Sequence, residues 1–331
     1  MRHRLGFRLT MVIGLMAFAA LAEDAKAQEL TKAAKDAMAK GRAFLLSRQG
    51  KDGSWSRDGM NYRVAYTAMG VMALMPGGKP PVKAPDVDAW KRGKAFLLNH
   101  AKARKDGYLG NVMYEHGLAT MALAKLWQTS TDKAADKDVQ IALKAAVDLI
   151  IKAQNAGGGW RYQPTPNAGQ DTSVTAMIAM ALGAVVDAGI EIPADTVKKM
   201  IACFNAAYDS GTGGLCYTPF AKRPSIACSY GGLMGLLYFG EKDSKVAKAV
   251  MTYVRNLPNA QFQATGHYFY VHHYAARAMH KAGGKDALTY YRKIRDALVK
   301  KQNEDGSWGT RGKRDVRHTA SAVLILETHS K

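Results

Sequence analysis

The chain has 331 residues, with 47 lysines and arginines against 27 aspartates and glutamates, 47% hydrophobic residues and three cysteines. This is the composition of a globular protein, so intrinsic disorder, a collagen-like helix and a small disulfide-rich scaffold are excluded. The formal net charge of +20 favours anionic partners such as acidic polysaccharide or lipid headgroups, and it is equally compatible with an ordinary solvated surface.

The first 27 residues have the layout of a secretory signal peptide. Arginines precede an apolar run of 14 residues from Leu9 to Ala22, and the small residues Ala25 and Ala27 flank Lys26 before Gln28. A membrane-spanning helix needs about 20 residues, so we expect cleavage and export, to the periplasm or beyond, with no stable membrane anchor. Because an exported protein does not meet nucleic acid, we expect none as a partner.

Residues 28–331 are predicted to form one domain built from repeats. Three turns share a glutamine, a short polar stretch, glycine and tryptophan, namely 49–55, 154–160 and 302–308. Weaker versions of the turn lie around residues 105, 213 and 266, which makes six repeats. We expect the recurring tryptophans and glutamines to tie each turn to its neighbour, which is a structural role.

Each repeat is predicted to hold two helices. Before every turn lies an amphipathic stretch with apolar residues at three-to-four spacing, as in 139–153 and 286–302, which predicts an outer helix. After every turn lies a small and apolar stretch whose polar residues sit only at its start, as in 67–74, 120–126 and 175–186. This pattern predicts a buried inner helix, so the chain is expected to form twelve helices in six hairpins.

Such hairpins must stack to bury their apolar faces. They could form an open solenoid or a closed ring. The inner stretches are too apolar for the exposed concave face of a solenoid, so the sequence predicts an all-α fold, an (α/α)6 toroid of six inner and six outer helices.

The Gln-x-x-x-Gly-x-Trp turns resemble the repeats of the terpenoid cyclase and protein prenyltransferase superfamily, also called prenyltransferase and squalene oxidase repeats. The segments 158–162 and 171–175 are similar to exported bacterial proteins of a squalene-cyclase-like group. The resemblance implies an α/α toroid. It implies architecture better than activity, because a fold of this kind carries unrelated functions.

The proton donor of the squalene cyclases is missing from this chain. The resemblance implies that the central aspartate of their Asp-x-Asp-Asp-Thr motif falls on Gln170, and only Asp171 and Thr172 match the motif. An amide cannot protonate an alkene. Cyclase chemistry by that route is therefore not expected.

The zinc ligands of the protein prenyltransferases are also incomplete. The resemblance implies that they fall on Ile226, Cys228 and His318, and catalytic zinc normally takes three protein ligands. We therefore expect no cofactor and no metal, with Cys228 and His318 as the only candidate zinc ligands. The other cysteines, Cys203 and Cys216, leave the disulfide state open, because an odd number cannot pair fully.

In a toroid the starts of the inner helices converge on one end of a central cavity, where unpaired N–H groups and helix dipoles favour anions. Polar and aromatic side chains gather at these starts. The predicted ligand-binding residues are Tyr62, Arg63, Tyr114, Glu115, Tyr230, Tyr270, His272 and Arg317, and the candidate catalytic residues are His116, Asp171 and His318.

Three functions stay open at this point. The first is a binding protein whose central cavity holds an amphipathic or anionic ligand without any chemistry, which the loss of both catalytic motifs favours. The second is a lyase that cleaves acidic polysaccharide by β-elimination, with Arg63 and Arg317 facing the uronate carboxylate and Tyr114, His116 or His318 as base. The third is a divergent terpene cyclase or prenyltransferase, which depends on the resemblance alone.

Overall fold

The computed structural model describes residues 30–56, 61–221, 223–263, 267–309 and 316–328, so the predicted signal peptide lies outside the described residues. Within these ranges the chain forms 13 α-helices and two short 3-10 helices, η1 (Pro76–Gly78) and η2 (Pro166–Ala168), and no strand longer than an isolated bridge. The predicted all-α class is confirmed. Among the described helices, none combines the length and the apolar character that crossing a membrane requires.

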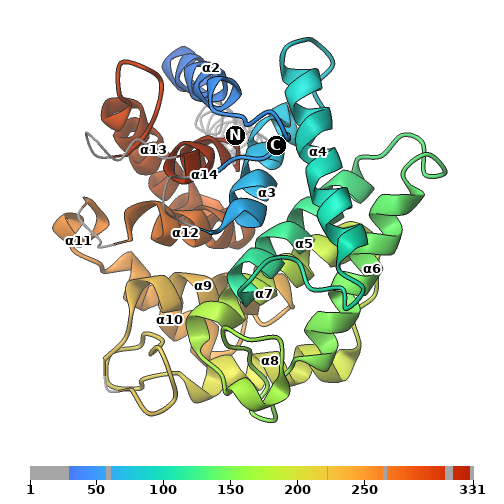
Figure 1. Cartoon of the computed structure of the whole chain (residues 1–331). Helices are drawn as coiled ribbons and strands as arrows, with labels where there is room; N and C mark the ends of the chain where they lie inside the picture. The colour runs from blue at the N-terminus through green and yellow to red at the C-terminus, as the bar shows by residue number, and fades with distance from the viewer. Residues whose placement is uncertain (1–29, 57–60, 222, 264–266, 310–315, 329–331) are drawn as a thin grey trace, which may run out of the picture.

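Six inner helices form a closed ring (Figure 1). They are α3 (Arg63–Ala73), α5 (Met113–Gln128), α7 (Thr172–Asp187), α9 (Ile226–Tyr238), α12 (Tyr268–Ala282) and α14 (Val316–Glu327). Each inner helix packs against the next one along the chain, and α14 returns to pack against α3. The ring is therefore closed, as predicted, and an open solenoid is excluded.

Six outer helices surround this ring (Figure 1). They are α2 (Lys32–Ser47), α4 (Asp86–Ala103), α6 (Lys137–Lys152), α8 (Ala194–Ala206), α10 (Lys245–Arg255) and α13 (Gly284–Lys301). The first of them, α2, packs against α13 and α14 and so joins the two ends of the described chain. A short additional helix, α11 (Asn259–Gln263), precedes α12.

The two kinds of helix differ in burial as their sequences predict. The inner helix α7 buries 13 of its 16 residues, whereas the outer helix α6 buries only five, at positions 139, 143, 146, 147 and 150. Small residues are needed where inner helices touch. A Cβ atom added at Gly231 of α9 would lie 2.6 Å from the Cβ of Ala176 in α7.

The repeated turns tie each hairpin to the next one. In the third repeat the Trp160 indole N–H donates to the Ile150 carbonyl at 2.8 Å, and the Gln154 amide donates to Gly158 of its own turn and to Thr196 of the next outer helix. Gln49 and Gln302 make the corresponding pairs of bonds, to Gly53 and Ala89 and to Gly306 and Ala37. The conserved geometry gives these residues the structural role that the sequence predicts.

Candidate functional site

The starts of the inner helices meet at what we call the tyrosine end of the ring, defined by Tyr114, Tyr162, Tyr217, Tyr270 and Tyr274. Tyr114 lies on α5 and Tyr270 on α12, which are not neighbours in the ring, yet their hydroxyl oxygens are 3.3 Å apart. This contact spans the axis of the ring. Tyrosine side chains therefore fill this end, where we expected a cavity.

The hydroxyl groups at the tyrosine end all donate towards one carboxylate. On one side Tyr217 donates to Asp171 Oδ2 at 3.1 Å, and the Tyr162 hydroxyl lies 2.9 Å from that of Tyr217. On the other side Tyr114 donates to Ser173 at 2.7 Å, and Ser173 donates to Asp171 Oδ1 at 2.6 Å. Aligned hydrogen bonds of this kind polarise one another, which rigidifies the network.

Asp171 is fully buried and fully bonded. It is the N-cap of α7, where its Oδ1 also accepts the Val174 N–H at 2.8 Å. The Arg161 guanidinium Nε lies 3.9 Å from Oδ2. A buried carboxylate is tolerated only when it is hydrogen-bonded and charge-compensated, and both conditions are met here. These contacts give the carboxylate of Asp171 an organising role.

The tyrosines of this network are donors at every accessible pH. Burial raises the pKa of Tyr114, Tyr217 and Tyr270 above the ordinary tyrosine value. Because a base must lose its proton easily, a raised pKa makes each phenol a poor general base. The chemistry that this arrangement supports is hydrogen bonding to a ligand.

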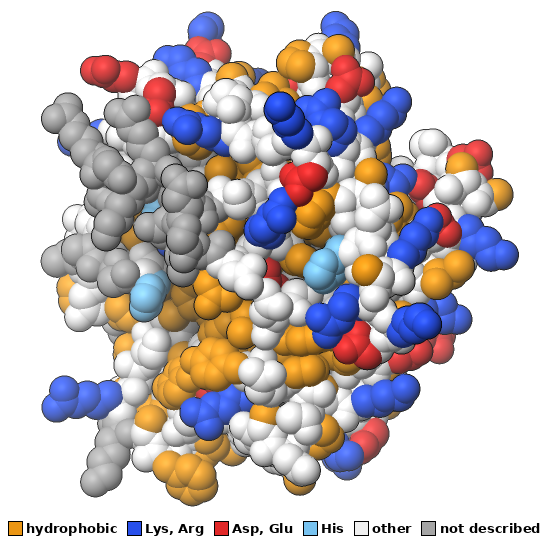
Figure 2. Space-filling model, in the orientation of Figure 1, with side chains coloured by type: hydrophobic (Ala, Val, Ile, Leu, Met, Phe, Trp, Pro, Cys, Tyr) orange, Lys and Arg blue, Asp and Glu red, His pale blue; other side chains and the backbone are white. Residues whose placement is uncertain are grey.

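The outer rim of the tyrosine end presents aromatic rings and one arginine to solvent. Tyr162 is 40% exposed and Phe220 is 93% exposed. The Arg161 side chain is 46% exposed, and its guanidinium lies 6.0 Å from the Tyr162 ring centroid. In Figure 2 hydrophobic side chains gather over α7 and α9, with lysines and arginines at the border.

Two predicted site residues of α5 serve packing instead. His116 is buried, accepts the Leu109 N–H on Nδ1 at 3.1 Å and lies with Nε2 3.0 Å from the Ala146 carbonyl of α6. Burial lowers its pKa to about 4. Glu115 accepts the Asn111 N–H at 2.7 Å, and burial raises its pKa.

Tyr230 and His272 lie together in a different place, between the ring and α13. His272 is buried with Nδ1 2.9 Å from the Tyr290 hydroxyl and Nε2 3.0 Å from the Phe262 carbonyl. The Tyr230 ring packs 6.2 Å from the Tyr290 ring. These partners join α9, α12 and α13, so neither side chain is brought to the tyrosine end.

Arg63 and Tyr62 face the first turn. The Arg63 guanidinium makes an ion pair with Asp52 and donates to the Ser54 hydroxyl at 2.7 Å. Tyr62 packs edge-on against Tyr66, with 6.4 Å between ring centroids. Arg63 therefore already has a carboxylate partner from its own repeat.

The candidate zinc ligands have other partners. The His318 ring stacks on Phe269 at 4.7 Å between centroids, and its Nε2 lies 2.9 Å from an Arg317 guanidinium nitrogen. Cys228 is buried, and burial raises the pKa of its thiol to about 12. Cys203 and Cys216 are also free and buried. Within the described ranges, no three His, Cys, Asp or Glu side chains are grouped so as to hold a metal ion.

Two expectations about this end need correction. The first N–H groups of α5 and α7 are not free for a ligand, because Met113 donates to the Tyr162 carbonyl at 2.9 Å and Thr172 donates to the Tyr217 carbonyl at 2.8 Å. In addition, a cavity of about 350 Å³ lies at the opposite end of the ring, where inner helices terminate.

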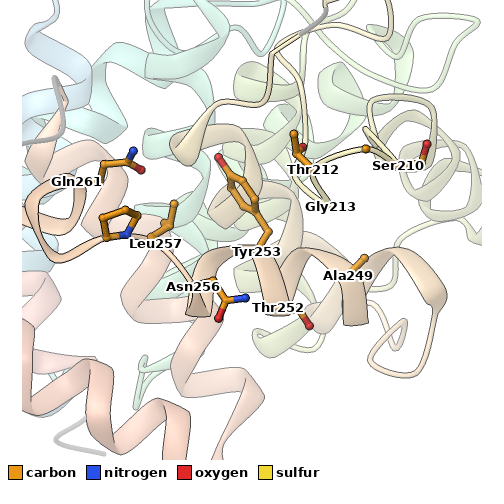
Figure 3. Close-up of a pocket in the computed structure, with 11 residues that line it drawn as sticks. Ser210, Thr212, Gly213, Ala249, Thr252, Tyr253, Asn256, Leu257 and Gln261 are labelled. Atoms are coloured by element: carbon orange, nitrogen blue, oxygen red, sulfur yellow. The ribbon is translucent and has the colours of Figure 1, made fainter.

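A second hollow lies outside the ring. It has a volume of about 560 Å³ between α10 and the 210–213 turn, and Figure 3 shows Tyr253 between Leu257 and Thr212 within it. Its lining consists of hydroxyl, amide, apolar and glycine residues and has no charged side chain. It therefore offers no ion pair to an anionic partner.

The sequence analysis did not identify Arg161, Tyr162 and Tyr217 as site residues. A signal was present, because Tyr162 and Tyr217 each lie two residues after the marker residue of their repeats, Trp160 and Leu215. Equivalent positions in neighbouring repeats face the same end of a ring. Their side chains were therefore predictable as a pair once the repeats were aligned.

Comparison with known proteins supports the fold and leaves the activity open. The sequence matches no protein-family model, and no curated protein is detectably similar to it in sequence. Among solved structures, an inactive variant of an α-1,6-mannanase from Salegentibacter in complex with α-1,6-mannotriose aligns with a TM-score of 0.69 and 9% identity, over 89% of this chain and 98% of that one.

Two other solved structures align over similar lengths. A type II terpene cyclase from Scytonema has a TM-score of 0.60 and 14% identity, over 90% of this chain and 96% of that one. A protein from Actinoplanes has a TM-score of 0.61 and 16% identity, over 90% of this chain and 100% of that one. The predicted resemblance to terpenoid cyclase-like toroids is thus confirmed at the level of fold.

Proposed function

We propose that this protein is an exported, non-catalytic binding protein whose tyrosine end binds an acidic glycan. The observation that carries the proposal is the exposed pair of Tyr162 and Arg161 above the buried, fully bonded Asp171. The proposal needs no metal and no cofactor.

An acidic sugar matches this pair in chemistry. The apolar face of a sugar ring packs on an exposed aromatic ring such as Tyr162, while the phenol hydroxyls of Tyr162 and Tyr217 are within reach of sugar hydroxyls. A guanidinium binds a carboxylate in a bidentate geometry, which suits Arg161 to a uronate group. The mannanase that shares the fold was captured with an oligosaccharide, which supports a glycan as the ligand class.

Several contacts argue against chemistry at this end. A lyase needs a base, but His116 is buried on the α6 side and the tyrosines have raised pKa values. A cyclase needs an acid in place of Gln170, and the Gln170 amide oxygen accepts the Gly159 N–H at 3.2 Å. We therefore place binding ahead of the lyase and terpene-processing alternatives.

Isothermal titration with oligogalacturonate and with neutral mannotriose tests the proposal. We expect Tyr162→Ala to weaken binding of both sugars, because the stacking face is lost. Arg161→Gln should weaken the acidic sugar about tenfold and leave the neutral one unchanged, since only a charge-assisted contact is lost. Arg292→Gln, at an exposed arginine of the outer helix α13, is the matched control.

Equal affinities for all four proteins, or no heat with either sugar, would overturn the proposal. Appearance of an unsaturated product that absorbs in the near ultraviolet would instead establish the lyase. The export part is tested separately by expressing the full chain and sequencing the amino terminus of the purified protein, which we expect to begin at Gln28.

A further inference from the structure

The cavity at the other end of the ring combines one buried cation with an apolar wall. It has a volume of about 350 Å³, within the lower part of the range of about 300–1,000 Å³ that small-molecule sites occupy. Inner helices from α3 to α14 line it near their carboxyl ends. The apolar part of the wall includes Met72, Met75, Met121, Ala184 and Leu324.

Arg277 of α12 is the cation at this cavity. Its guanidinium donates to the carbonyl of His273, one turn earlier in the same helix, at 2.9 Å. Within the described residues, no carboxylate lies within 4 Å of it, whereas the buried Arg42 pairs with Glu327. Burial lowers the pKa of Arg277 to about 10, so the side chain is charged at neutral pH but poorly compensated.

The two carboxylates of the cavity wall have other partners. Asp187 accepts the Tyr238 hydroxyl at 2.7 Å, and Glu327 is paired with Arg42. Lys281 lies with its ammonium 4.6 Å from the Tyr238 ring, and Lys125 also lines the wall. The cavity therefore carries an excess of positive charge.

Helix ends alone do not account for this charge. Basic side chains near a helix carboxyl end complement the macrodipole, which acts within the last turn and is worth about 0.3–1 kcal/mol at the surface. Arg277 lies five residues before the end of α12 at Ala282, outside that last turn. A buried guanidinium with one neutral partner retains donors for an anion.

We propose that this cavity is a second binding site, which takes an amphipathic carboxylate such as a medium-chain fatty acid. The carboxylate would accept hydrogen bonds from Arg277, and the alkyl chain would lie among the methionines, whose flexible thioethers adapt to varied apolar ligands. This site is independent of the glycan site proposed above, because it lies at the opposite end of the ring.

Thermal unfolding and titration with decanoate, decanol, decylamine and inorganic phosphate test the site. We expect only decanoate to raise the melting temperature clearly. Arg277→Met should weaken decanoate binding about tenfold or more, because one or two charge-assisted hydrogen bonds are lost. Arg292→Met, which changes an exposed arginine in the same way, should leave it unchanged.

A second variant protects the test against a folding failure at position 277. Ala184→Leu adds three carbons to the cavity wall and leaves Arg277 in place, so it should weaken decanoate binding while the protein stays folded. Equal binding of decanol and decanoate, with no effect of Arg277→Met, would overturn the proposal. So would a phosphate effect as large as that of decanoate with Ala184→Leu silent, because binding would then depend on charge alone.

Discussion

The two ends of the ring solve the same problem in opposite ways. Each end has one buried ionised side chain close to the axis, Asp171 at the tyrosine end and Arg277 at the cavity end. Asp171 has four donors around it, whereas Arg277 has a single carbonyl partner and a cavity. The difference teaches that a buried charge is part of the scaffold when the protein satisfies it, and marks a ligand site when the protein does not.

The largest effect expected from this comparison is at the satisfied charge. Asp171→Ala leaves Tyr217, Ser173 and Arg161 without their acceptor and removes the cap of α7. We expect the free energy of unfolding to fall by about 3–5 kcal/mol, the usual cost of breaking a buried ion pair from one side. Urea unfolding followed by circular dichroism measures it, and a loss below about 1 kcal/mol would remove the contrast between the ends.

The second prediction concerns acid. His116 and His272 are buried near the starts of α5 and α12, and burial lowers the pKa of each to about 4. The unfolded chain, with a histidine pKa of about 6.5, binds protons that the folded protein does not, so stability is present above pH 6.5 and is lost as the pH falls towards 4. We expect a loss of roughly 2–5 kcal/mol between pH 7 and pH 4.

Urea unfolding at several pH values measures this loss. His116→Asn should remove a large part of the pH dependence, because one of the two titrating groups is gone. A stability that stays constant from pH 7 to pH 4.5 would mean that these histidines are not buried as described.

The third prediction isolates the contact across the axis. Tyr270→Phe removes the hydroxyl that faces Tyr114, Tyr274 and the Ser173 carbonyl. We expect a loss of about 1–2 kcal/mol of unfolding free energy, as for one or two buried hydrogen bonds. A variant with unchanged stability would show that these hydroxyls do not hold the end together.

The smallest stability effect is expected at the unsatisfied charge. Arg277→Met replaces a poorly compensated guanidinium with an apolar side chain of similar length. We expect a change within about 1 kcal/mol of zero, or a gain, because the desolvation penalty of the ion disappears. A loss as large as that of Asp171→Ala would show that Arg277 belongs to the scaffold.

The sequence predicted the fold well because the repeats encode it locally. The turn glutamines and tryptophans fix each hairpin, and the contrast between α6 and α7 in apolar content separates outer from inner helices. Closure was also predictable, since Gln302 repeats in the last turn the bonds of Gln154 and so reaches Ala37 of the first outer helix.

The site was less predictable because side-chain direction depends on partners that are distant in sequence. His116 and Tyr114 are two residues apart at the start of α5, yet His116 turns to Ala146 and Tyr114 turns to Tyr270 across the axis. Arg277 lies deep in an inner helix, where the sequence shows only a lone arginine among alanines. Its exposure to a cavity depends on side chains from several inner helices.

The central claim is tested most directly by titrating oligogalacturonate into the protein and into its Tyr162→Ala and Arg277→Met variants. We predict saturable binding to the unchanged protein, a clear loss in Tyr162→Ala and an unchanged affinity in Arg277→Met, because the glycan contacts the tyrosine end alone. Binding that survives Tyr162→Ala, or that is lost in Arg277→Met while the fold is intact, would contradict the claim.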